Sequence, residues 1–136
     1  MPSIRGIGYV GFSVRDAAAS AEWYRALFDL HEAGLEEHPG WISVLLEHPA
    51  GFSIGLIQHR TNDGTAFSEF RTGLDHLEFE VENERELDAW RAKLDGLGIP
   101  HSGAFGHIVT FRDPDNIQLE FFWRGGMDHD GDRSLT

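Results

Sequence analysis

Polar and apolar side chains alternate strictly from His76 to Val81, within a segment at residues 74–81 near the middle of the chain. Such period-two alternation predicts a β-strand with one face in a hydrophobic core. The opposite face of this strand is unusual, because it carries an imidazole and two carboxylates, His76, Glu78 and Glu80. The strand is therefore a candidate for a chemical role as well as a structural one.

The first half of the chain is predicted to contain a strand, a helix and a set of further strands. Asp16 precedes an alanine-rich stretch of high helix propensity, and Asp is a good N-cap. The expected buried stripe of this helix comprises Ala19, Trp23, Ala26, Leu27 and Leu30. The strands are expected at residues 7–14, 41–47 and 52–58, the last two joined by a turn at 48–51, with a polar connection over residues 31–40.

The second half repeats this order. After the strand at 74–81, Asn83 is expected to cap a helix that runs to about Leu97. Its apolar stripe is predicted to be Leu87, Trp90, Leu94 and Leu97. Further strands are expected at 99–103, 107–112 and 117–123, with a turn at 113–116, a linker at 59–72 that Phe67 and Phe70 dock on the body, and a mobile tail at 124–136.

The two halves also match residue by residue. With an offset of 67 the matched pairs are Gly6/Gly73, Phe12/Phe79, Val14/Val81, Trp23/Trp90, Leu27/Leu94 and Leu30/Leu97, and with an offset of 65 they are Val44/Val109 and Pro49/Pro114. A half of roughly 65 residues could not cover its own sheet well. We therefore predict a single domain built from two repeats, at about residues 4–58 and 73–123.

Composition narrows the functions further. The chain has no cysteine, which excludes disulfides, thiolate metal sites and a cysteine nucleophile. Its formal charge of −12 makes a nucleic-acid partner unexpected, because a polyanion would be repelled. No apolar run approaches the roughly 18 residues of a membrane helix, so we expect no membrane association and a cytoplasmic protein.

Three segments resemble the vicinal oxygen chelate superfamily, which includes glyoxalase I, bleomycin-resistance proteins, fosfomycin-resistance enzymes and extradiol dioxygenases. The segments are residues 11–16 with 22–24, residues 74–79, and residues 112–120, whose Asp-Pro-Asp-Asn is similar to the family's Asp-Pro-Asp-Gly-Asn turn without the glycine. The resemblance covers roughly residues 4–123. It implies an α+β fold in which two βαβββ modules form a curved mixed sheet around a cleft, with the helices outside, and it implies a homodimer.

The resemblance also implies an incomplete metal site. His76 matches the histidine of the second module and Glu120 matches the carboxylate of the final strand, a pair that suits divalent Fe, Mn, Ni, Co or Zn. Where the family has a first-module ligand this chain has Tyr9, and the repeat places Gly55 opposite Glu120. The first module thus lacks both expected donors.

Three residues could complete the ligand set. Tyr9 could bind a ferric ion as a phenolate, and Glu78 lies two residues after His76 on the same strand face. A four-residue turn at 113–116 would pair Val109 with Glu120 and bring His107 to the face of Glu120. The alternatives are that His76 is an ordinary half-buried histidine, that Tyr9 and His107 contact substrate or serve structure, and that Glu78 is solvated.

Two functions from different classes follow. In the first, the protein is a metal-dependent enzyme of lyase, isomerase or dioxygenase type that acts on a small oxygen-chelating substrate. Tyr9 or Glu78 would then position or shuttle a proton. In the second, it is a metal-free protein that sequesters a small molecule or drug, as bleomycin-resistance proteins do; a degenerate interaction domain is a third alternative. Trp41 and Phe122 are candidates for the apolar wall of the cleft. Residues 128–132 resemble a cation loop but lack its distal glutamate, so we assign them to the tail.

Overall fold

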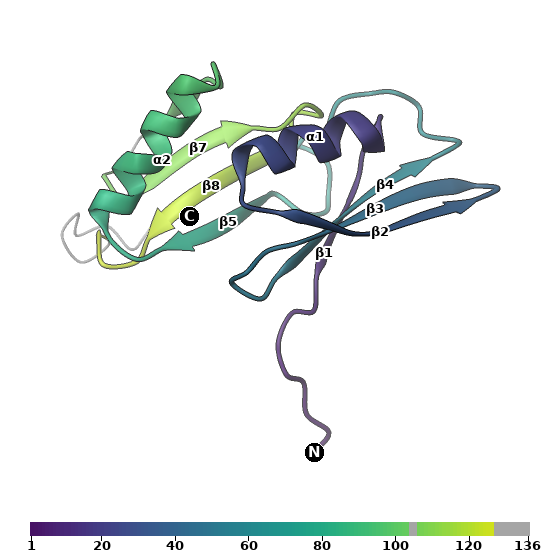
Figure 1. Ribbon diagram of the computed structural model, residues 1–136, viewed down its shortest axis with the longest axis horizontal. Helices are drawn as coiled ribbons and strands as arrows, with labels where there is room; N and C mark the ends of the chain where they lie inside the picture. The colour runs from purple at the N-terminus through teal and green to yellow at the C-terminus, as the bar shows by residue number, and fades with distance from the viewer. Residues whose placement is uncertain (104–105, 127–136) are drawn as a thin grey trace. The chain divides into compact units, whose positions relative to one another are not determined.

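The chain folds into two compact units, residues 1–65 and the residues from 66 onward. The computed structural model describes residues 1–103 and 106–126 of the 136. Each unit contains a strand, a helix and three further strands, in that order (Figure 1). The predicted pair of βαβββ modules is confirmed.

The first module is a four-stranded mixed sheet with one helix. Its elements are β1 (Val10–Ser13), α1 (Ala17–Leu27), β2 (His31–His38), β3 (Trp41–Glu47) and β4 (Ser53–His59). The spatial order of the strands is β1-β4-β3-β2, in which β1 runs parallel to β4 and the other neighbours are antiparallel. Helix α1 lies along one face of this sheet, which leaves the other face without a helix from its own module (Figure 1).

The second module repeats this topology. Its elements are β5 (His76–Val81), α2 (Glu84–Gly96), β6 (His101–Ser102), β7 (Ile108–Arg112) and β8 (Gln118–Trp123). The strand order is β5-β8-β7-β6, again with one parallel pair, β5 and β8. The same order of pairing in both modules is the structural counterpart of the repeat in the sequence.

Helix α1 begins where the sequence predicts but buries a different stripe. The Asp16 side chain accepts a hydrogen bond from the backbone N–H of Ala19 at 3.0 Å, which is N-cap geometry. The buried residues are Ala17, Ser20, Ala21, Tyr24 and Leu27. Ala19 and Ala26 are exposed, so their expected burial is wrong. A stretch rich in alanine carries little information about the buried face, and the phase is set by Tyr24, whose ring stacks between those of Phe12 and Phe28.

Helix α2 follows its prediction more closely. Asn83 caps it, and Leu87 and Leu94 are buried against the sheet. Trp90 stacks on Phe121 of β8 with ring centroids 4.2 Å apart, as expected of a core tryptophan. Leu97 is exposed because the helix ends at Gly96 and Gly98 then adopts a left-handed φ of +69°.

Strand β2 was not predicted as a strand. Its eight residues pair antiparallel with β3, although the sequence indicated a polar connection with no more than short extended pieces there. The strand lies at the edge of the sheet and is almost wholly exposed, so it has no apolar face that alternation could reveal. Strand β1 is shorter than expected, since Ile7 precedes it and is exposed.

The linker between the modules docks on the second module through its backbone. The N–H of Phe67 donates to the carbonyl of Asp115 at 2.8 Å, and the Asn116 side chain donates to the carbonyl of Phe67 at 3.0 Å. Glu69 adds a two-pronged ion pair with Arg112, at 3.0 and 3.1 Å. Phe70, in contrast, is 92% exposed, so the expectation that it docks is wrong.

No helix among the described residues is long and apolar enough to cross a membrane. The predicted tail falls mostly on residues 127–136, which lie outside the described residues. That range includes residues 128–132, whose sequence resembles a cation loop.

Candidate metal site of the second module

Strands β5 and β8 pair in a register that brings polar side chains of both strands together on one face of the sheet. In this parallel pair His76 is next to Gln118, and Glu78 is next to Glu120. Residues beside each other in a sheet point to the same face. The opposite face, which carries Leu119 and Phe121, packs toward α2. The side of the sheet that α2 does not cover thus carries the His76 imidazole and the carboxylates of Glu78, Glu80 and Glu120.

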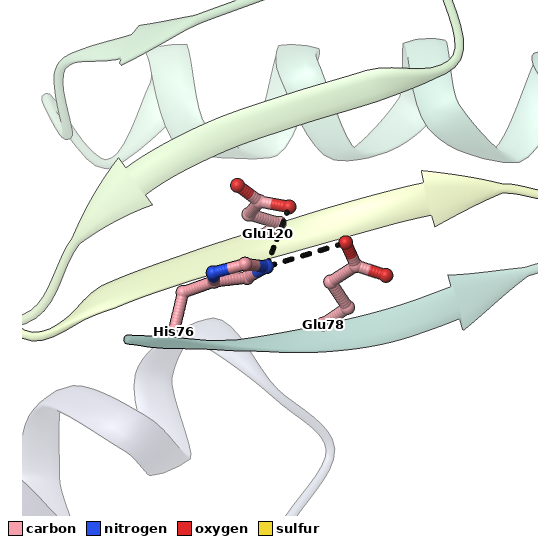
Figure 2. Close-up of side chains that lie close together, drawn as sticks. All are labelled: His76, Glu78 and Glu120. Carbon is pink, nitrogen blue, oxygen red and sulfur yellow. Dashed lines mark hydrogen bonds and ion pairs between the residues drawn. The ribbon is translucent and has the colours of Figure 1, made fainter. Parts of the chain in front are cut away.

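The three side chains point toward one another. His76 Nε2 lies 3.4 Å from Glu78 Oε1 and 3.5 Å from Glu120 Oε2 (Figure 2). One nitrogen and two oxygens, one from each residue, lie within 4.8 Å of one another. Glu120 is buried, with 6% of its surface exposed, whereas Glu78 is open to solvent and His76 is intermediate.

Burial and like charge act on the protonation of the buried carboxylate. Burial raises the pKa of Glu120, and a hydrogen bond with the neighbouring Glu78 carboxyl raises it further. The Gln118 amide and the His76 ring act in the opposite direction without cancelling this rise. Without a cation, the site therefore carries more negative charge than its surroundings favour.

The same surroundings stabilise the protonated imidazole. Partial burial by itself lowers the pKa of His76, but the Asp75 hydrogen bond and the charges of Glu120 and Glu78 outweigh it, so the net pKa is raised. A proton on His76 thus partly neutralises the acidic cluster, and a divalent cation would do so more completely.

The donor set fits a divalent ion. With bonds of about 2.1 Å, two donors around a tetrahedral or octahedral ion stand roughly 3.0–3.4 Å apart. The separations of 3.4 and 3.5 Å from His76 Nε2 to the two carboxylate oxygens are close to this range. One imidazole with two carboxylates suits Mn, Fe, Co, Ni or Zn. Three donors also leave coordination positions open to solvent or substrate.

The register of β7 and β8 differs from the expected one and separates His107 from this cluster. Arg112 pairs with Gln118 and Thr110 pairs with Glu120, one residue away from the predicted pairing of Val109 with Glu120. His107 precedes β7, is fully buried, and meets the Phe122 ring edge-on with centroids 5.9 Å apart. The structure therefore does not place His107 beside His76 and Glu120.

The cause of the register difference lies in the turn. Asp113 Oδ1 accepts hydrogen bonds from the backbone N–H groups of Asp115 and Ile117, both at 2.8 Å, which holds one more residue in the turn than expected. Asn116 adopts a left-handed φ of +70°, the conformation that glycine or asparagine takes most readily. Asn116 thus supplies the left-handed residue of a turn that lacks the glycine of the family's Asp-Pro-Asp-Gly-Asn sequence.

The first module has glycines at the corresponding place. Gly11 of β1 pairs with Gly55 of β4, as Glu78 pairs with Glu120 in the second module. The ring of Tyr9 lies over both glycines: a Cβ atom on Gly55 would stand 2.6 Å from Tyr9 Cε2, and one on Gly11 would stand 3.4 Å from its hydroxyl.

Within residues 1–103 and 106–126, the His76 cluster is the one group of three or more His, Asp or Glu side chains arranged to hold an ion.

The Tyr9 ring also borders a cavity of about 710 Å³ on the first module. Its wall combines apolar and hydroxyl side chains, among them Trp41, Ser43, Leu45, Ser53 and Ile57. Trp41 therefore lies at a cavity. Phe122 is instead largely covered in the second module, where the Arg124 guanidinium stands 5.6 Å from its ring centre.

Two residues in contact with the cluster were missed from the sequence. The Asp75 side chain contacts His76 Nδ1 at 2.7 Å, and the Gln118 amide donates to Glu120 Oε1 at 2.8 Å. The signal for Gln118 was present, since it lies two residues before Glu120 on the same strand face. Asp75 directly precedes His76, so strand alternation assigned it to the other face.

The comparisons with known proteins agree with this fold. The chain belongs to the glyoxalase/bleomycin resistance protein/dioxygenase superfamily, whose sequence profile matches residues 6–121. A glyoxylase/bleomycin resistance protein/dioxygenase domain from Frankia sp. EAN1pec is similar in structure, with a TM-score of 0.81, 34% identity, and coverage of 89% of this chain and 98% of that one. The fold expected from the sequence resemblance is confirmed.

Two more distant relatives are also similar. The uncharacterized protein YqjT of Bacillus subtilis is 27% identical over 122 residues, which cover 82% of this chain and 94% of that protein. A mutant of the fosfomycin resistance protein FosX of Listeria monocytogenes, complexed with Mn(II) and 1S,2S-dihydroxypropylphosphonic acid, superposes with a TM-score of 0.68 at 17% identity, covering 89% of this chain and 93% of that one. At that identity the likeness to FosX is one of fold.

Proposed function

We propose that this protein is a metal-dependent enzyme that acts on a small substrate with two neighbouring oxygen atoms. The observation that carries the proposal is the convergence of His76 Nε2 with a carboxylate oxygen of Glu78 and one of Glu120. The burial of Glu120 supports it, because a carboxylate with a raised pKa in a partly covered acidic cluster gains most from a cation.

The residues of the cluster divide into two roles. His76 and Glu120 are the ligands, since one supplies a neutral nitrogen donor and the other a buried carboxylate. Glu78 is the more exposed carboxylate and takes either a third ligand position or the part of a base that accepts a proton from substrate. When bound, a divalent ion such as Mn, Fe, Co, Ni or Zn supplies a Lewis acid that polarises the substrate oxygens.

FosX from Listeria monocytogenes, complexed with Mn(II) and a dihydroxypropylphosphonic acid, supports the idea that this fold accommodates such an ion and an oxygen-rich ligand. The ligand set proposed here lies within one module. It therefore needs no donor from Tyr9 or Gly55, the two positions at which the family pattern is missing. Tyr9 and Trp41 border the cavity of the first module, whose wall includes aromatic and aliphatic side chains that suit an organic ligand.

The test is metal analysis of protein purified without a histidine tag, followed by titration of the stripped protein with Mn²⁺, Fe²⁺, Co²⁺, Ni²⁺ and Zn²⁺. His76→Ala and Glu120→Ala should abolish binding and the accompanying rise in melting temperature. His101→Ala is the matched control, because His101 forms a similar pair with Asp95 at 2.7 Å elsewhere in the same module. A wild-type protein that neither carries nor acquires any of these ions would overturn the proposal.

A metal-free binding function is the second candidate, and the cavity beside Tyr9 favours it. Its tyrosine, tryptophan and aliphatic walls could hold an aromatic ligand, and the net charge of −12 favours a cationic one. Calorimetric titration of the metal-stripped protein with bleomycin tests this form of the proposal. Saturable binding that Tyr9→Ala weakens and His76→Ala leaves intact would support it, and the absence of any heat would contradict it.

We also propose a homodimer, because proteins with this fold commonly pair their modules between subunits. Sedimentation at micromolar concentration tests this, and a species of about 15 kDa, the mass of one chain, would contradict it.

A further inference from the structure

Each proposed ligand presents one atom to the site and has its other atom engaged by a neighbour. The His76 ring directs Nε2 at Glu78 and Glu120, while its Nδ1 lies 2.7 Å from Asp75 Oδ1. A contact of that length between a ring nitrogen and a carboxylate oxygen needs a proton, which the imidazole must donate. In the neutral ring the proton then lies on Nδ1 and the lone pair on Nε2.

Glu120 shows the same division between its two oxygens. Oε1 accepts a hydrogen bond from the Gln118 amide at 2.8 Å, and Oε2 is the oxygen that lies 3.5 Å from His76 Nε2. Gln118 and His76 are neighbours in the register of β5 and β8, so the pairing of the strands itself brings the amide to this place. The carboxylate is thereby held so that a single oxygen faces the cluster.

We propose that Asp75 and Gln118 are positioning residues of the metal site, which fix the tautomer of His76 and the orientation of Glu120. The inference rests on the proposed function, since it concerns the ligands assigned there. A neutral histidine ring without such a hydrogen-bond partner prefers the tautomer with its proton on Nε2, and that proton would block metal binding at Nε2. A ligand already held in its binding orientation loses less conformational entropy when it binds.

The lengths of the competing contacts indicate which tautomer wins. The Nδ1 contact with Asp75 is 2.7 Å, a short charge-assisted hydrogen bond, whereas the Nε2 contacts with Glu78 and Glu120 are 3.4 and 3.5 Å. A proton on Nδ1 therefore makes the stronger bond. Gln118 has a second effect, because engaging Oε1 leaves Glu120 as a one-oxygen ligand and keeps neighbouring coordination positions open.

The first experiment reads the tautomer directly and needs no metal. Nitrogen-15 spectra of histidine-labelled, metal-stripped protein at about pH 9, where imidazole is neutral, should show His76 with its proton on Nδ1. Asp75→Ala should return it to the Nε2–H form. Asp75→Asn keeps an acceptor oxygen and should retain much of the Nδ1–H form. A wild-type His76 already in the Nε2–H form would overturn the assignment of Asp75.

The second experiment measures Mn²⁺ affinity by calorimetry. Asp75→Ala and Gln118→Met should each weaken binding by about 10- to 100-fold, and the melting temperature of the metal-free protein is measured alongside to show that each variant is folded. Asp88→Ala is the matched control for Asp75, because both carboxylates are 65% exposed and it removes the same charge away from the site. It should change the affinity less than about twofold.

The outcomes separate this inference from the function on which it rests. A wild type that binds Mn²⁺ and variants that bind equally well would overturn the positioning role and leave the metal site standing. Losses at Asp75→Ala no larger than at Asp88→Ala would likewise overturn it. Absence of Mn²⁺ binding by the wild type would overturn the proposed function, whereas the tautomer of His76 would still test the contact with Asp75.

Discussion

Glu78 and Glu120 are side by side on the parallel strands β5 and β8, at the place where the first module pairs Gly11 with Gly55. The two modules share a strand order and differ at this pair. In the second module the carboxylates meet His76, and in the first the Tyr9 ring covers the glycines. The duplicated fold thus carries an acidic cluster in one copy and an aromatic cavity in the other.

Glu120→Gln should stabilise the metal-free protein at neutral pH. The folded-state pKa of Glu120 lies above its ordinary value of 4.5, so its contribution to stability is present at low pH and is lost as the pH rises through the folded pKa. Removing the charge should therefore raise the free energy of unfolding at pH 7. Urea denaturation in EDTA measures this. A loss of stability at pH 7, or a gain that persists at about pH 4, would contradict the account.

Deprotonation of His76 as the pH rises should lower the stability of the metal-free protein and strengthen metal binding. Because its folded-state pKa is raised above 6.5, His76 stabilises the metal-free protein fully below about that pH, and this contribution is lost as the pH rises through the raised pKa. Metal binding requires the deprotonated ring and should strengthen over the same interval. Melting curves with and without Mn²⁺, from about pH 5.5 to 8.5, should therefore show a metal-induced shift that grows with pH. A shift independent of pH would exclude His76 as a ligand.

Gly55→Ala should disturb Tyr9 and leave the metal site intact. The new methyl group would stand 2.6 Å from Tyr9 Cε2, and the ring can swing away because Tyr9 is 54% exposed. We expect a loss of less than about 1 kcal/mol of stability, together with weaker ligand binding in the cavity. Tyr9→Ala should remove the stability effect of Gly55→Ala, which a double-mutant cycle measures. Additive losses would place the ring elsewhere.

Asn116→Ala should destabilise the second module by about 1–2 kcal/mol. Alanine tolerates the φ of +70° poorly, and the variant also loses the bond from the Asn116 side chain to Phe67. Asn116→Gly loses only that bond and should cost less. Chemical denaturation of both variants gives the comparison, and equal losses would assign the whole effect to the linker contact.

The repeat and the resemblance together predicted the modules, the helices and the proximity of His76 to Glu120. The features that they did not predict depend on local interactions. The alanine-rich stretch did not define the buried face of α1, and β2, being an exposed edge strand, has no alternation to detect. The β7–β8 register depends on two hydrogen bonds to Asp113 and on the left-handed Asn116, which act through backbone geometry rather than through hydrophobic pattern.

The prediction for the cluster was similarly partial. Strand alternation correctly placed His76 and Glu78 on one face, and the family pattern supplied Glu120. The sequence left open whether Tyr9, His107 or Glu78 joins them. The structure brings Glu78 to the cluster and places His107 in the core.

Anomalous diffraction from crystals grown with Mn²⁺ would locate the proposed ion. We expect one strong peak per chain within about 2.0–2.4 Å of His76 Nε2 and Glu120 Oε2, with Glu78 or a water molecule completing the shell. Crystals of His76→Ala should lack that peak. A wild-type map without a peak at this cluster, or with its strongest peak elsewhere on the chain, would contradict the account.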